Sequence, residues 1–192
     1  MGQEFELKYR ASARQMAAIV EDYQGFREIA METAYFDTDE DSLFQRRWML
    51  RCRVENGVSV CTLKTPGENG ARNEWETECA DIQAAIPELC KLGAPAELEA
   101  LTAKGLTKIG SARFTRQAAL VEAEGCTLEL ALDRGILQGG VRMEFLREAE
   151  VELKSGSREA LIAFGNALAA RYGLLPLRPS KYARVLALTG RV

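Results

Sequence analysis

Glu148-Ala149-Glu150-Val151-Glu152-Leu153-Lys154 is the stretch that decides the fold, and Glu4-Phe5-Glu6-Leu7-Lys8 has the same pattern near the start of the chain. Successive side chains of a β-strand point to opposite faces, so each stretch would place its charges on one face and its apolar residues on the other. Two acidic faces that end in lysine can hold divalent cations. A half-exposed antiparallel strand with its charges in water shows the same alternation.

The alternation recurs in two further segments, which favours a bound ligand over simple exposure. Arg51 and Arg53 alternate in Leu-Arg-Cys-Arg-Val, and charged residues alternate again through 72–78, Arg-Asn-Glu-Trp-Glu-Thr-Glu. Like charges that face each other across strands destabilise a sheet. Several strands with Glu-x-Glu or Arg-x-Arg faces therefore indicate something bound between them.

Length and charge limit the class of protein. The chain has 192 residues, of which 47% are hydrophobic, so residues 1–192 are expected to form one domain with a substantial core. The net charge is −3 and the isoelectric point is about 5.3, which argues against nucleic acid or an anionic membrane as the partner. A polyanion would have to be attracted by a local cluster of arginine and lysine.

Missing residue types exclude several chemistries. The chain contains no histidine, which removes Ser-His-Asp, Cys-His and histidine-metal sites. No secretory signal and no apolar run of about 20 residues is present, so a cytoplasmic protein is expected. An odd number of cysteines without a C-x-x-C pair signals neither a disulfide framework nor a zinc site, and reduced thiols are expected at Cys52, Cys61, Cys79, Cys90 and Cys126.

Turn and periodicity signals predict a strand-rich chain. Asn56-Gly57 is a strong hairpin signal, Ser12 is a helix N-cap candidate, and Gly173 stands where a helix should end. Helices are predicted over about 12–23, 81–91, 95–104 and 157–172. Strands are predicted over about 3–10, 31–38, 47–55, 58–65, 71–79, 106–116, 117–124, 127–133, 141–154 and 182–188.

The arrangement of these elements follows from their faces. Antiparallel strands with charges on one face form either a sheet with one wet face or a closed barrel with a charged lumen. The helices have apolar stripes that need cover, and the apolar faces of the strands can provide it. We therefore expect a barrel or tunnel lined by glutamate, arginine and lysine.

Motifs in collinear order over nearly the whole chain resemble those of the CYTH domain, also called the triphosphate tunnel metalloenzymes. The resemblance implies an α+β fold in which an antiparallel eight-stranded β-barrel, the triphosphate tunnel, has helices packed on the outside. It also implies a stand-alone CYTH protein that binds triphosphates with Mg²⁺ or Mn²⁺. The segments that carry the resemblance are Glu4-x-Glu6-x-Lys8, Tyr35-Phe36-Asp37-Thr38, Leu50-Arg51-Cys52-Arg53, Thr62-Leu63-Lys64, Arg72-Asn73-Glu74-x-Glu76, Leu132-Asp133-Arg134-Gly135, Glu148 to Gly156, and Ser180-Lys181-Tyr182-Ala183-Arg184.

The candidate phosphate-binding residues are cations. A triphosphate carries about four negative charges, and arginine offers a planar fork for phosphate oxygens while lysine offers a point charge. Solvated surface cations are the alternative for Arg72, Arg113 and Lys154. The full set of candidates is Arg51, Arg53, Lys64, Arg72, Arg113, Arg116, Lys154 and Lys181.

The candidate metal ligands are carboxylates, because hard divalent cations take oxygen ligands. Glu74 and Glu76 are assigned to the substrate site, where they would bind metal, position a cation or orient water. Lys8 occupies the place of the family's catalytic lysine, as a general base or as a phosphate-holding cation. The metal candidates are Glu4, Glu6, Asp133, Glu148, Glu150 and Glu152.

The expected activity is metal-dependent hydrolysis of a triphosphate by in-line attack of water on the terminal phosphorus. Inorganic tripolyphosphate is the first choice, because the recognisable motifs concern phosphate and metal. Thiamine triphosphate is the nearest alternative; Trp48 and Trp75 would be the residues to stack on an organic group, although a core role is favoured for both. A class IV adenylyl cyclase is less favoured, since that class has histidine-containing features. A non-catalytic triphosphate-binding module is the remaining alternative. No small-molecule partner other than the triphosphate, and no oligomeric state, is indicated.

Overall fold

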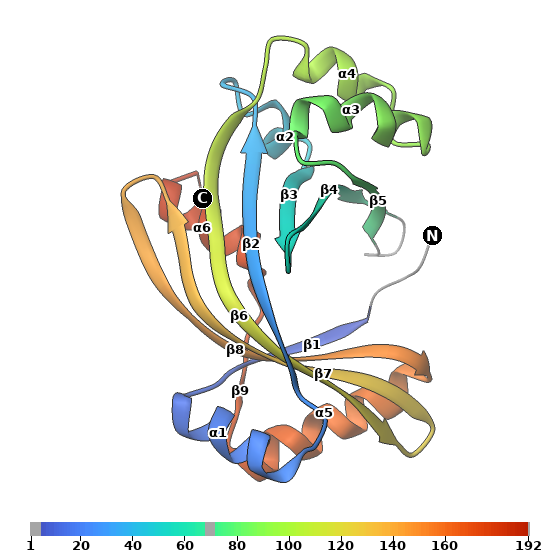
Figure 1. Cartoon of the computed structure of the whole chain (residues 1–192), viewed down its shortest axis with the longest axis vertical. Coiled ribbons are helices and arrows are strands. Elements are labelled where there is room, and N and C mark those ends of the chain that lie inside the picture. The colour runs from blue at the N-terminus through green and yellow to red at the C-terminus, as the bar shows by residue number, and fades with distance from the viewer. Residues whose placement is uncertain (1–4, 68–71, 192) are drawn as a thin grey trace.

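The computed structural model describes residues 5–67 and 72–191. Its main feature is a nine-stranded antiparallel sheet in the order β5-β4-β3-β2-β6-β7-β8-β1-β9. Figure 1 shows β2, β6, β7 and β8 as long, strongly bent strands, so that the sheet wraps around a central space. The strands are β1 Glu6–Arg10, β2 Arg27–Asp37, β3 Met49–Glu55, β4 Val58–Pro66, β5 Arg72–Glu78, β6 Thr107–Ala123, β7 Cys126–Gly139, β8 Arg142–Gly156 and β9 Leu175–Pro176.

The α+β tunnel-like fold expected from the sequence is confirmed. The sheet has one more strand than the eight expected, because β9 adds two residues beside β1. Within the described residues, no hydrogen-bonded ladder joins β5 to β1 or β9, so the wall of the tunnel is open there. The curvature of the long strands, and not ring closure, brings the two ends of the sheet to face each other.

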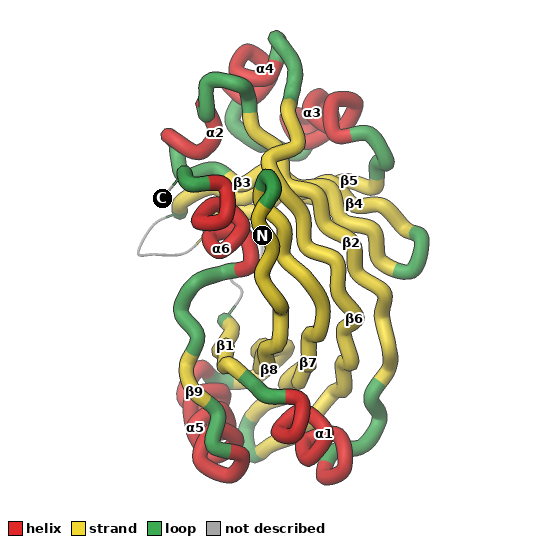
Figure 2. Tube along the Cα trace, turned by 90° about the vertical axis from the view of Figure 1, so that its left-hand side faces the viewer, coloured by secondary structure: helices red, strands yellow, loops and turns green. Residues whose placement is uncertain are grey.

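Helices cover the outer face of the sheet at its two ends (Figure 2). At one end α1 (Ala13–Asp22) and α5 (Arg158–Tyr172) bury a core with the apolar sides of β1, β7 and β8. At the other end α3 (Ile82–Lys91) and α4 (Glu97–Thr102) cover β3, β4 and β5. Trp48 and Trp75 belong to this second core, which confirms their core role. The charged faces of the strands are therefore left on the inside of the curve.

The Asn56-Gly57 turn explains how β3 pairs with β4. Asn56 and Gly57 both have positive φ, 47° and 90°, as a type I′ turn requires. This turn sets the register of β3 against β4, which pairs Arg51 with Thr62 and Cys52 with Cys61. A short helix, α2 (Ser42–Gln45), was not predicted.

Asp37 explains that short helix. Its buried carboxylate accepts hydrogen bonds from the backbone N–H groups of Thr38, Leu43 and Phe44 at 2.7–2.9 Å. The Phe36-Asp37-Thr38 segment is therefore built to end β2 and start α2.

Two predictions of secondary structure were wrong. Residues 107–123 form one strand and not two, because Gln117 and Ala118 stay paired with β7. Residues 182–188 were predicted as a strand but belong to helix α6 (Lys181–Thr189). Ser180 caps this helix by accepting a hydrogen bond from the N–H of Ala183, and Gly190 ends it in the left-handed conformation.

Helix α6 packs against the inner face of β6 and β7. A Cβ on Gly110 would lie 2.3 Å from Cγ1 of Val185, and one on Gly139 would lie 2.5 Å from the carbonyl oxygen of Val185. These two glycines leave the space that the helix fills. The close approach directs Lys181, the first residue of α6, into the interior of the tunnel.

Candidate active site

One cavity of about 140 Å³ gathers most of the charged residues singled out from the sequence. Strands from both ends of the sheet contribute to it, together with the start of α6. Seven cationic side chains and three carboxylates line it: Lys8, Arg51, Arg53, Lys64, Arg72, Arg116 and Lys181 with Glu6, Glu150 and Glu152. Tyr35, Met49, Ser180 and Tyr182 complete the lining and were not singled out as site residues. The excess of positive charge suits a polyanion.

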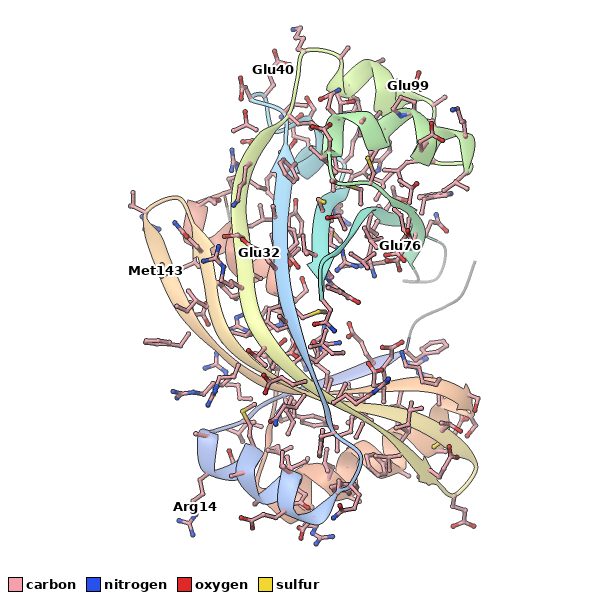
Figure 3. All side chains as sticks on the ribbon, viewed as in Figure 1. Arg14, Glu32, Glu40, Glu76, Glu99 and Met143 are labelled. Carbon is pink, nitrogen blue, oxygen red and sulfur yellow. The ribbon has the colours of Figure 1, made fainter. Side chains whose placement is uncertain are left out.

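The cations of β3 and β4 form one wall of the cavity. Lys64 Nζ lies 2.8 Å from Glu74 Oε2, and Arg51 Nη2 lies 3.6 Å from Glu76 Oε1. Figure 3 labels Glu76 on β5, beside this wall. Thr62 accepts a hydrogen bond from Arg51 Nε at 3.3 Å. The glutamates of β5 thus hold the cations in position.

Arg53 stands two positions further along β3, on the same face as Arg51. Its Nε donates to Thr33 Oγ1 at 3.4 Å, and Glu55 is a weak ion-pair partner at 3.4 Å. Burial lowers the pKa of Arg53, and the neighbouring Arg51 lowers it further. Two arginines crowded in this way would gain from an anion placed between them.

Five side chains form a buried ion-pair cluster: Asp133, Glu148, Glu150, Arg116 and Lys181. Arg116 holds Asp133 in a bidentate pair, with both contacts at 2.8 Å, and also contacts Glu150. Lys181 Nζ lies 2.7 Å from Asp133 and 2.9 Å from Glu150, and it contacts Glu148. Outside the cluster, Arg184 pairs with Glu148 at 2.7 Å.

Protonation in the buried ion-pair cluster follows from these contacts. Burial by itself would raise the pKa of Glu150, but Lys181, Arg116 and Lys8 outweigh it and hold that pKa well below its usual range. Burial raises the pKa of Glu148, and Lys181 offsets this only in part. Burial works against the charge on Lys181, yet the three carboxylates raise its pKa above the usual value.

A second set of acids, the open acidic row, consists of Glu6, Glu152 and Glu129. Glu152 on β8 faces Glu6 on β1 and Glu129 on β7, so three like charges stand side by side across three strands. Their side chains are 40%, 28% and 22% exposed. Lys8 pairs with Glu6 at 2.7 Å and Lys154 with Glu152 at 2.9 Å. Glu129 was missed from the sequence, although Leu128-Glu129-Leu130 carries the same alternation.

The open acidic row fits a divalent metal ion better than the buried ion-pair cluster does. Carboxylates directly opposite one another repel, and a cation between them removes the repulsion. Mg²⁺ keeps several waters, so it needs the room and exposure of the open row. In the buried cluster, oxygen atoms of Asp133, Glu148 and Glu150 lie within 4.8 Å of one another, but lysine and arginine already neutralise them.

Several predicted residues lie elsewhere. Arg113 does not reach the cavity: it is 78% exposed and pairs with Glu32 at 2.7 Å on the outer face, because it stands three positions from Arg116 on the same strand. Lys154 does not line the cavity but contacts the open acidic row. Glu4 lies outside the described residues.

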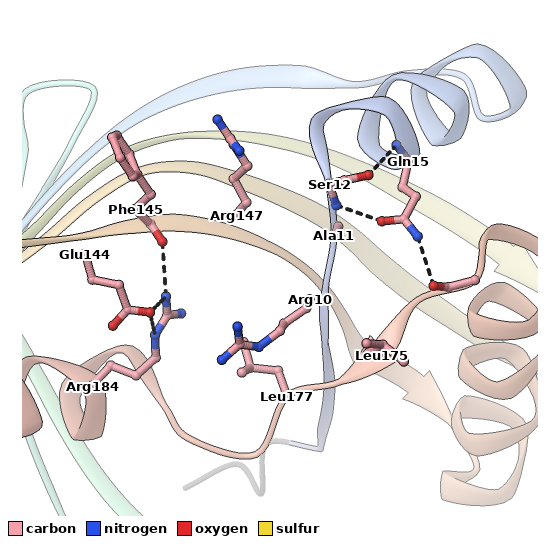
Figure 4. A pocket seen from close by; sticks show the side chains of 11 residues that line it. Arg10, Ala11, Ser12, Gln15, Glu144, Phe145, Arg147, Leu175, Leu177 and Arg184 are labelled. Carbon is pink, nitrogen blue, oxygen red and sulfur yellow. Dashed lines mark hydrogen bonds and ion pairs between the residues drawn. The ribbon is translucent and has the colours of Figure 1, made fainter.

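A separate cavity of about 290 Å³ lies beside the edge of β8 (Figure 4). Arg184 crosses one side of it, donating to Glu144 at 2.7 Å and to the carbonyl oxygen of Phe145 at 3.4 Å. These contacts attach α6 to β8. Because Arg184 and Lys181 belong to the same helix, these contacts help to keep Lys181 in the buried cluster.

Comparison with known proteins identifies the family. The family model of the CYTH domain matches residues 2–186. The chain belongs to the CYTH family. An inorganic triphosphatase from Haemophilus influenzae is 31% identical over 132 residues, which are 68% of this chain but 38% of that protein. The chain thus matches well under half the length of this curated relative.

Solved structures agree on the fold. A Pyrococcus horikoshii protein superposes with a TM-score of 0.62 at 22% identity, covering 96% of this chain and 98% of the other. A Hippeastrum protein, described as an adenylyl cyclase homologue with a dominant triphosphatase activity, gives 0.63 at 19% identity, covering 97% and 96%. Among the described residues, no helix has the length and apolar character needed to cross a membrane.

Proposed function

We propose that this CYTH protein hydrolyses triphosphates with the help of a divalent metal ion, and that inorganic tripolyphosphate is its substrate. The observation that carries the proposal is the cavity in which seven cations and three carboxylates meet, with the acids gathered on one side. A triphosphate of about four negative charges matches that excess of positive charge. The similarity to an inorganic triphosphatase supports the same conclusion.

The two walls divide the work of binding. Arg51, Arg53 and Lys64 are fixed by Thr62, Thr33 and Glu74, so their donors stand ready for phosphate oxygens. Such preorganised cations cost little reorganisation when the substrate binds. We assign this wall to the two phosphates that leave together.

The opposite wall receives the terminal phosphoryl group. Glu6, Glu129 and Glu152 would hold Mg²⁺ or Mn²⁺, and the Glu4-x-Glu6 spacing in the sequence makes Glu4 a further candidate ligand. The metal, when bound, would neutralise charge on the phosphoryl oxygens and orient water. Lys8 Nζ forms an ion pair with Glu6, so we assign it to holding a phosphoryl oxygen and not to accepting a proton.

The direction of attack follows from this division. In-line displacement requires the water to approach from the side opposite the leaving group. With the leaving pyrophosphate on the cationic wall, the water approaches from the acidic wall, where carboxylate oxygens orient it. Arg116 and Lys181, held by three carboxylates, lie between the walls and stabilise the charge on the group in transfer.

The lining favours a substrate without a large organic group. Trp48 and Trp75 pack in the core under α3 and do not line the cavity, so neither can stack on a thiazole or a purine there. The aromatic rings that do line it, Tyr35 and Tyr182, pack on each other at 5.3 Å between ring centroids.

Phosphate release should be measured with Mg²⁺ from tripolyphosphate, thiamine triphosphate and ATP, with cyclic AMP assayed in the ATP reaction. We expect kcat/KM for tripolyphosphate to exceed the others by about tenfold or more, the effect of about 1.4 kcal/mol of transition-state binding. Turnover of none of the three would contradict the proposal, and formation of cyclic AMP would assign the cavity to cyclisation.

A matched pair of variants ties the activity to the cavity. Arg53→Ala removes a cation from inside the tunnel, and Arg113→Ala removes one from the outer face. Only the first should lower kcat/KM. Equal losses in both variants would place the activity elsewhere.

A further inference from the structure

Three cysteines gather on the outer side of β3, β4 and β5, away from the cavity. The thiols of Cys52 and Cys61 both lie against the carbonyl oxygen of Cys79, at 3.7 Å and 3.2 Å. The thiol of Cys61 also has the thiol of Cys52 as a hydrogen-bond partner, so the two sulfur atoms are neighbours. Cys61 is fully buried, whereas Cys52 is half-buried at the margin of the core under α3.

The strand register places Cys52 and Cys61 directly opposite each other. Glu55 and Val58 flank the two-residue turn and form a hydrogen-bonded pair. Facing residues further from the turn then alternate between pairs without and pairs with backbone hydrogen bonds between them. Counting back from the turn, the cysteine pair is of the non-hydrogen-bonded type. Its Cα atoms are then about 4.5 Å apart, inside the range in which a disulfide forms.

We propose that Cys52 and Cys61 form a reversible cross-strand disulfide when the protein is exposed to a hydroperoxide, and that this bond weakens phosphate binding by Arg51 on the other face of β3. Nothing in the tunnel chemistry calls for two facing thiols at this place. Cys90 and Cys126, the remaining cysteines, do not lie on these strands.

The oxidation proceeds in two balanced steps. The Cys52 sulfur attacks the peroxide and becomes a sulfenic acid, while the peroxide is reduced to an alcohol or to water. The Cys61 sulfur then attacks the sulfenic sulfur, and its proton leaves with the hydroxyl as water. Cys52 takes the first role because it is the more exposed of the two thiols. Burial, with the hydrogen bond to Cys52 next, raises the pKa of the Cys61 thiol, so Cys61 loses its proton less readily and is the slower of the two toward peroxide.

The bond would change the opposite face of the sheet. Facing Cβ atoms in an antiparallel pair are about 4.5 to 5.5 Å apart, whereas a disulfide holds them about 3.8 Å apart. Oxidation therefore draws β3 and β4 together on the outside and spreads them on the inside. On the inner face, Arg51 precedes Cys52 and Thr62 follows Cys61. Arg51 donates a hydrogen bond to Thr62 at 3.3 Å, and this contact should lengthen on oxidation.

The first test is whether the disulfide forms, and the second is whether it changes KM. After treatment of the full chain with hydrogen peroxide and denaturation, alkylation should label three of its five thiols, and the intact mass should fall by two hydrogen atoms. Peptide mapping should show Cys52 joined to Cys61, and dithiothreitol should restore all five thiols. Five free thiols, a link through Cys79, or addition of oxygen to a single thiol would each overturn the proposal.

Variants provide the controls. Cys52→Ser and Cys61→Ser should each abolish the loss of thiols, whereas Cys126→Ser should still lose two. The effect on phosphate binding rests on the proposed function. KM for tripolyphosphate should rise by about threefold or more on oxidation, as loss of one hydrogen bond produces. It should not change in Cys52→Ser. Because the link is scored by mass, a failure of the proposed activity would remain distinguishable from a failure to form the disulfide. A disulfide that leaves KM unaltered would overturn the coupling to Arg51.

Discussion

The buried ion-pair cluster and the open acidic row contain the same kind of residue in the same sheet, yet they are built for opposite purposes. Asp133, Glu148 and Glu150 have cations at 2.7 to 2.9 Å and almost no exposure. Glu6 and Glu152 face each other as like charges, with water on one side. The first set is neutralised inside the protein, whereas the second has three facing carboxylates with Lys8 and Lys154 as their nearest cations and can take up a further cation from solution.

The comparison shows that closeness of carboxylates does not identify a metal site. The three acids of the buried cluster are close enough to share an ion. A metal ion there would have to displace Lys181 and Arg116 and leave their charges buried without partners, which costs several kcal/mol. A cation on the open row relieves the repulsion among its three acids and competes there with Lys8 and Lys154, which are both partly exposed.

Asp133→Asn should have the largest effect, and it should be on stability. The change leaves Arg116 and Lys181 without one of their carboxylates, and removal of one partner from a buried ion pair costs about 3–5 kcal/mol. Urea unfolding without metal checks this. Glu32→Gln, which breaks the exposed pair with Arg113, should have a far smaller effect, because solvent screens that pair. Equal values would remove the distinction between buried and exposed pairs.

Glu152→Gln should have the opposite profile. It removes the central charge of the open acidic row, so metal-dependent turnover should fall by about a hundredfold, as loss of roughly 2.7 kcal/mol of transition-state stabilisation implies. The melting temperature without metal should not fall, since the change relieves repulsion with Glu6 and Glu129. A less stable protein with normal turnover would assign Glu152 to the structure and leave the row without a metal.

Arg53→Lys should lower kcat/KM for tripolyphosphate by about tenfold, because lysine keeps the charge but loses the planar fork. Arg113→Lys on the outer face is the control and should have no effect. If the two variants behave alike, the cationic wall does not depend on arginine geometry, and the phosphates are held by charge alone.

The smallest effect concerns pH. The folded pKa of Glu150 is lowered, so its charge contributes stability that is present above its unfolded pKa, about 4.3, and is lost as pH falls through the folded value. The difference in unfolding free energy between wild type and Glu150→Gln should therefore shrink as pH is lowered from 6 towards 3. A difference that stays constant over this range would show that Glu150 is not held ionised by Lys181 and Arg116.

Local alternation made much of the site predictable from the sequence. The charged side of β1, β3 and β8 follows from the period of two, and this places Glu6, Arg51 and Glu150 on the inside. What the alternation cannot give is which acids meet which cations, since Lys181 reaches Asp133 only because α6 packs on Gly110 and Gly139. The prediction of a strand at 182–188 did not take that packing into account. Glu129 was overlooked because a single charge between two leucines also describes an ordinary exposed position.

The open side of the tunnel wall has a consequence for the end of the reaction. Within the described residues, no hydrogen-bonded ladder joins β5 to β1. The bent strands β2 and β6 are therefore the strands of that part of the chain that connect the cationic wall to the acidic wall. Under the proposed function, an intact tripolyphosphate would bind both walls and connect them. Its hydrolysis would remove that connection and leave pyrophosphate on one wall and phosphate on the other. The products would then depart separately as the two walls move apart, without either having to pass through a closed ring.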